Sequence, residues 1–139
     1  MVKEFINYAL DRGLRPQLTE KTEDQTPDVI LFDKNDLHFV FLAEESRDPH
    51  FFQLILPNID DYQRNNEKQL ETILTLTREY KTGKVVVTKK GGITLSFEQF
   101  VFSDVDINKL FEQAIGCLSA MFVEYRKKLN SCETEEESK

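Results

Sequence analysis

The residue types that most often carry enzyme chemistry are scarce in this sequence. It has two histidines, His38 and His50, and two cysteines, Cys117 and Cys132. Two histidines cannot build a three-histidine zinc site, and the cysteine spacing fits no zinc knuckle. Cys117 falls within an apolar helical pattern, where cysteine usually acts as a small hydrophobic residue. Neither residue type therefore predicts a nucleophile or a metal centre.

Paired carboxylates are the remaining candidates for acid–base or cation chemistry. Acidic pairs occur at Glu44/Glu45, Asp60/Asp61 and Asp104/Asp106. Two of the three pairs lie where helices are predicted to begin, and the helix dipole alone favours aspartate there. We therefore predict no catalytic residue, no metal ligand and no cofactor. An enzyme or small-ligand site made from carboxylates that only folding brings together is the alternative.

Positive charge is concentrated in one short stretch. Five basic residues form this candidate electrostatic patch: Arg78, Lys81, Lys84, Lys89 and Lys90. The competing interpretation is a solvated helix end followed by a hairpin tip, because lysine is common at both places. The whole chain carries a formal charge of −7, which disfavours nucleic acid and anionic membrane surfaces as partners.

The length and composition fit one soluble domain. The chain has 139 residues, of which 40% are hydrophobic, enough for a single packed core. No apolar run approaches the roughly 20 residues that span a bilayer. The first residues lack the continuous apolar segment of a signal peptide, so we expect a cytoplasmic protein.

Periodicity and turn residues predict the elements that must position these side chains. A short helix over residues 2–10 precedes a polar internal loop at 15–27. Three apolar strands, a helix, a hairpin and a long helix follow; they cover residues 29–32, 37–43, 51–56, 58–80, 84–102 and 107–129. The hairpin turns at Gly91-Gly92, where we expect positive φ. The predicted fold class is α+β, a five-stranded antiparallel sheet with three helices in the order α-βββ-α-ββ-α. Residues 1–130 form the single domain, and 131–139 an acidic disordered tail.

Several predicted strands are apolar on both faces, which a sheet with one wet face would not be. The second face must therefore be covered by a helix of the chain, a second subunit or a client protein. The candidate protein-interaction surface consists of aromatic and aliphatic residues from these strands: Phe39, Phe41, Phe51, Ile55, Phe100 and Phe102.

The order of elements resembles the type III secretion chaperone-like fold, including the YbjN-like families. The segment from Leu56-Pro57-Asn58 through Lys84-Val85-Val86 to Ile93-Thr94-Leu95 is similar to the helix-to-hairpin part of YbjN-like proteins. The resemblance implies a small, acidic, often homodimeric and non-enzymatic protein, and the secretion chaperones bind extended segments of their clients. We expect a non-enzymatic interaction module, chaperone-like or regulatory, that forms a homodimer and whose partner or client the sequence does not name.

Overall fold

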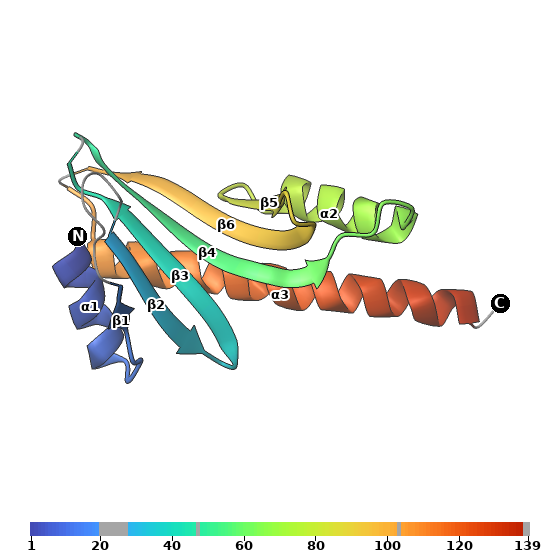
Figure 1. The fold of residues 1–139 in the computed structure, drawn as a ribbon, viewed down its shortest axis with the longest axis horizontal. Helices are drawn as coiled ribbons and strands as arrows, with labels where there is room; N and C mark the ends of the chain where they lie inside the picture. The colour runs from blue at the N-terminus through green and yellow to red at the C-terminus, as the bar shows by residue number, and fades with distance from the viewer. Residues whose placement is uncertain (20–27, 47, 103, 138–139) are drawn as a thin grey trace.

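A computed structural model describes residues 1–19, 28–46, 48–102 and 104–137, with side chains described for residues 1–19 and from Val29 to Asn130 within those ranges. In chain order the elements are α1 (Val2–Asp11), β1 (Gln17–Leu18), β2 (Asp28–Lys34), β3 (Leu37–Glu44), β4 (His50–Asp61), α2 (Glu67–Glu79), β5 (Gly83–Val87), β6 (Gly92–Val101) and α3 (Ile107–Glu137). Figure 1 shows a twisted sheet that lies across the long helix α3. The α+β class is confirmed.

The number of strands and their order differ from the prediction. The described residues form one six-stranded antiparallel sheet in the order β1-β2-β3-β4-β6-β5, so the predicted five-stranded α-βββ-α-ββ-α arrangement is wrong. The additional strand is β1, which lies inside the predicted loop 15–27 and pairs with Leu31 and Ile30 of β2. Two residues carry no alternation of their own, so only the neighbouring strand makes this segment a strand. The rest of that loop, residues 20–27, lies outside the described residues.

The helix predicted from Asn58 begins later than expected. Asn58 does not cap it; β4 continues to Asp61, and Asn66 is the N-cap, accepting a hydrogen bond from the Gln69 backbone N–H at 3.0 Å. Asn58 instead has φ +52° at a bulge between Leu56 and Asp60. An asparagine followed by two acidic residues fits either a helix start or a bulged strand, and pairing with β6 decides for the strand.

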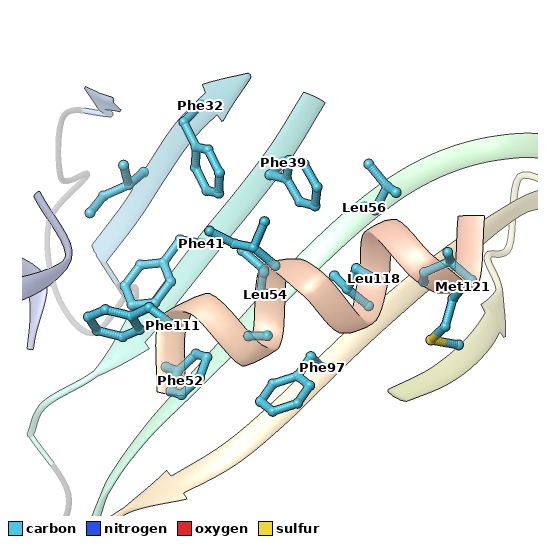
Figure 2. Packing of buried hydrophobic residues seen from close by; sticks show 14 of the residues in the cluster. Phe32, Phe39, Phe41, Phe52, Leu54, Leu56, Phe97, Phe111, Leu118 and Met121 are labelled. Carbon is cyan, nitrogen blue, oxygen red and sulfur yellow. The ribbon is translucent and has the colours of Figure 1, made fainter. Parts of the chain in front are cut away.

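The helices pack on one face of the sheet. Figure 2 shows the side chains that this inner face of the sheet presents to α3, among them Phe41, Phe52 and Phe97. Phe111 of α3 meets Phe41 edge-on, with ring centroids 5.6 Å apart. Phe5 of α1 stacks on the same Phe41 ring at 4.0 Å. An aromatic cluster thus joins α1, α3 and the middle of the sheet.

Helix α3 begins where it was predicted to begin but ends later than predicted. Asp106 caps its start, accepting a hydrogen bond from the Lys109 N–H at 3.3 Å. The helix is assigned through Glu137, beyond the predicted end at residue 129. Residues 138–139, and the side chains of 131–137, lie outside the described part of the chain, and the tail over 131–139 stays a prediction. Among the described residues, no helix has the length and apolar character needed to cross a membrane.

Candidate functional site: the open face of the sheet

The face of the sheet opposite the helices is called the open face here. Alternation along the strands assigns its side chains. They come from β2, β3, β4, β6 and β5: Val29, Leu31, Asp33, His38, Val40, Leu42, Glu44, Phe51, Gln53, Ile55, Thr94, Ser96, Glu98, Phe100, Lys84 and Val86. Apart from the small Thr94 and Ser96, these side chains are exposed or half-buried, in contrast to the fully buried inner face.

An apolar row crosses the open face. Strand register places Leu31, Val40 and Ile55 directly beside one another on β2, β3 and β4. Leu31 is 38% exposed, and Val40 and Ile55 are half-buried. Directly opposed apolar side chains on neighbouring strands contact each other. This row is the apolar centre of the open face.

A polar network lies next to that row. The Gln53 side-chain amide donates to Ser96 Oγ at 3.0 Å and to Glu98 Oε1 at 2.9 Å. Lys84 Nζ lies 3.0 Å from the same Glu98 oxygen. The positive and negative charges are therefore paired, and this part of the face has little net charge. The sequence analysis did not predict the network; the signal that could have revealed it is the alternation of Thr94, Ser96 and Glu98 with apolar residues along β6.

The structure divides the predicted protein-interaction residues between the two faces. Phe39 and Phe41 are 1% and 0% exposed in the core, so they have no surface to offer a partner. Their place in that set is corrected: alternation directs them to the inner face, under α1 and α3. Phe51, Ile55 and Phe100 lie on the open face, with the Phe51 and Phe100 rings 5.1 Å apart. Phe102 follows β6 and is 58% exposed.

The predicted electrostatic patch also separates. Arg78 and Lys81 lie at the end of α2 and just beyond it, and Lys84 lies at the start of β5. Lys89 and Lys90 lie past the other end of β5, about 16 Å from Lys84 at the rise of an extended strand. The five residues thus flank β5 at both ends and do not form one compact cluster.

The histidines and the described cysteine form no catalytic arrangement. His38 Nδ1 contacts Asp33 Oδ1 at 2.6 Å, but both side chains are exposed. His50 begins β4 and is exposed. Burial raises the pKa of the Cys117 thiol, whose sulfur contacts Met121 Sδ at 3.9 Å. A raised pKa reduces the reactive thiolate, as expected for a packed cysteine.

The acidic pairs do not converge on one another within the described residues. No group of three or more histidine, cysteine or acidic side chains lies close enough there to hold a metal ion. Asp60 is used structurally: Tyr125 of α3 donates to its Oδ2 at 2.7 Å, and the buried Gln69 amide donates to the Tyr125 oxygen at 3.1 Å. Burial, followed by the Asp60 hydrogen bond, raises the pKa of Tyr125 above its ordinary range.

A cleft of about 430 Å³ lies where α1 ends, beside β1 and β2. Its lining includes Arg15, Gln17, Leu31 and Asp33. This cleft is one concave site that a small ligand could occupy, and it meets the open face at Leu31.

Comparison with known proteins adds information on the fold. The sequence matches no family model and no curated protein. The fold is similar to that in the crystal structure of an uncharacterised protein from Methanothermobacter thermautotrophicus, with a TM-score of 0.59 and 10% sequence identity. The similarity covers 93% of this chain and 96% of that chain. At 10% identity the match establishes a shared fold and says nothing about function, which has to be argued from the geometry of the site.

Proposed function

We propose that this chain is a non-enzymatic protein-interaction module whose open face binds a second copy of the chain. The observation that carries the proposal is the contrast across one sheet. Three helices cover the inner face, whereas apolar side chains on the open face stay exposed or half-buried among the described residues. Soluble proteins rarely leave a contiguous apolar surface without a partner.

The size of the open face supports a dimer. Strands β2, β3, β4, β6 and β5 together are about 24 Å wide, and an eight-residue strand is about 26 Å long, which gives roughly 600 Å². Two copies would bury roughly 1,200 Å², which is the lower end of the roughly 1,200–2,000 Å² that stable specific interfaces bury.

Charge also permits two copies to meet at this face. The chain carries −7, so two copies repel each other in general. The open face, however, holds Lys84 paired with Glu98 beside the apolar row of Leu31, Val40 and Ile55. Asp33, which His38 contacts, and Glu44 also lie on this face, so the repulsion is weakest at the apolar row itself.

The wider role we propose is regulatory or chaperone-like, in the cytoplasm. The cytoplasmic location rests on the sequence expectation alone. Membership of the YbjN-like families remains a prediction from the sequence pattern.

Light scattering coupled to gel filtration, at several protein concentrations, tests the dimer. We expect the wild-type protein to have twice the chain mass and Ile55→Glu to be a monomer, because a charge within the apolar row would be buried in the interface without a partner. Val123→Glu makes the same kind of change on an exposed position of α3 and should leave the dimer intact.

Two results would contradict the proposal. A wild-type protein that stays monomeric at every concentration removes the second copy as partner. A dimer that survives both Ile55→Glu and Leu31→Glu, with circular dichroism unchanged, moves the interface away from the open face.

A further inference from the structure

The two edges of the sheet differ in length. One edge is β1, with two residues; the other is β5, with five residues, Gly83–Val87. Val86 and Val87 point to opposite faces and are 37% and 41% exposed. Helix α2 packs against β5 and Gly83 at its start is buried, so the exposed part of this edge is its second half. An open edge of this length can accept a further strand.

The direction of the backbone groups on β5 follows from its pairing with β6. The Thr88 N–H donates to the Gly92 carbonyl at 2.9 Å, so Thr88 faces β6 in a hydrogen-bonded pair. Hydrogen-bonded pairs alternate in an antiparallel ladder, so Val86 and Lys84 also bond to β6, opposite Thr94 and Ser96. The N–H and C=O groups of Val85 and Val87 therefore point away from the sheet. No described residue forms a backbone hydrogen bond with them on that side.

Lysines flank this edge at both ends. Lys81 and Lys84 lie at its start, and Lys89 and Lys90 lie just past its end; all four are exposed. Only Lys84 forms an ion pair with a described residue, Glu98. On a chain of charge −7, these lysines place positive charge at both ends of the β5 edge.

We propose that the β5 edge binds an acidic, extended peptide segment of another protein, which adds to the sheet as a seventh strand beside β5. The backbone groups of Val85 and Val87 supply the hydrogen bonds, and the flanking lysines select acidic residues at the two ends of the segment. Val86 and Val87 favour β-branched residues at its centre.

The same charges disfavour the other obvious occupant, a β5 strand from a second copy. Two antiparallel β5 strands would bring both sets of flanking lysines together, and like charges directly opposed destabilise a sheet. The lysines thus prevent self-pairing and permit an acidic partner.

A labelled synthetic peptide, Glu-Glu-Val-Thr-Val-Glu-Glu, is the probe, with binding followed by fluorescence anisotropy. We expect saturable binding that weakens as salt rises. Two control peptides separate the contribution of charge from the contribution of strand pairing. Replacing each Glu by Lys should abolish binding through charge, and replacing the central Thr by Pro should weaken it at least tenfold, because a strand with proline pairs poorly.

Variants of the protein locate the site. The double variant Lys89→Glu/Lys90→Glu should bind the acidic peptide at least tenfold more weakly. The matched control Lys109→Glu/Lys127→Glu makes the same charge change at exposed positions on α3 and should bind normally apart from a small general loss. Val85→Pro removes an outward N–H and leaves the flanking pairs with β6, so it should also weaken binding.

Amide chemical shifts measured by NMR keep the test independent of folding. Peptide should shift the Val85 and Val87 amides in the wild-type protein. Equal binding of the proline peptide would overturn strand addition, and equal loss in both lysine double variants would overturn the location. Absence of binding overturns the proposal altogether. Each result is separate from the dimer, which the peptide experiment does not measure.

Discussion

The two faces of β3 and β4 are made of similar residues yet have different environments. Phe39, Phe41, Phe52 and Leu54 point to the inner face and are almost completely buried; Val40, Leu42, Phe51 and Ile55 alternate with them and remain half-buried. Apolar composition therefore does not decide which face becomes the core. The helices decide, because the apolar stripes of α1 and α3 pack on only one side.

The largest effect that tests this contrast comes from neighbouring residues on β3. Phe41→Ala should lower the free energy of unfolding by about 3–5 kcal/mol, because it empties the centre of the aromatic cluster. Leu42→Ala, one residue along and on the open face, should cost about 1 kcal/mol or less in the monomer. Urea denaturation at low protein concentration measures both. Similar losses for the two variants would mean that the open face is also packed.

A second test concerns the bulge of β4, where the pairing register with β6 shifts between Leu56 and Asp60. A Cβ at Gly92 would overlap the side-chain oxygen of Asn58. Gly92→Val should therefore destabilise the fold by about 1–3 kcal/mol, as overpacking usually does. The melting temperatures of Gly92→Val and of the double variant Gly92→Val/Asn58→Gly show whether the contact with Asn58 causes the loss.

The double variant should recover much of the loss, since glycine tolerates the φ of +52° at position 58. No recovery would show that another contact is responsible. The expected positive φ belongs to Gly91, at +85°, so the sequence-based reason given for Gly92 was wrong.

The third test concerns the hydroxyl group of Tyr125, a polar group of α3 that lies between Gln69 and Asp60. Tyr125→Phe should cost about 1–2 kcal/mol, because the Gln69 amide and Asp60 each lose a hydrogen bond. Tyr62→Phe, whose hydroxyl has no described partner, is the matched control and should change little. Chemical denaturation at neutral pH measures both. Equal losses would indicate a general effect of removing a hydroxyl.

The same tyrosine predicts a pH dependence. The pKa of Tyr125 is raised in the fold and lies near 10 in the unfolded chain. A raised folded pKa stabilises the protein below the unfolded pKa and loses that contribution as pH rises past it. Stability should therefore fall above about pH 10. Tyr125→Phe should show a smaller fall. The remainder is due to Tyr8, Tyr80 and Cys117, whose pKa values burial also raises, and to the Met1 amino group, whose pKa, against the lowering effect of burial, is raised by Glu4 and Glu45. A fall of the same size in the variant would exclude Tyr125 as its source.

The comparison also explains what the sequence could predict. The three helices, the five longer strands and the alternation on β3 follow from local periodicity, which the residues themselves carry. The strand β1, the late start of α2 at Glu67 and the choice of inner face depend on contacts with distant residues. The same holds for the candidate site. Phe51, Ile55 and Phe100 could be found from two-sided patterning, but patterning could not separate them from Phe39 and Phe41.

The position of β6 between β4 and β5 has a consequence for how the chain folds during synthesis. Residues 50–61 pair with residues 92–101, and α2 and β5 lie between them in the sequence. Strands β1–β4 can assemble early, but β4 keeps an unpaired edge until residue 101 has been made, and β5 has no neighbour before then. Such non-local pairing is slow, and the exposed edge of β4 is open to wrong partners in the meantime. A chain truncated before residue 92 should therefore aggregate, whereas one that includes β6 and α3 as far as Tyr125 should reach a paired sheet with its inner face covered.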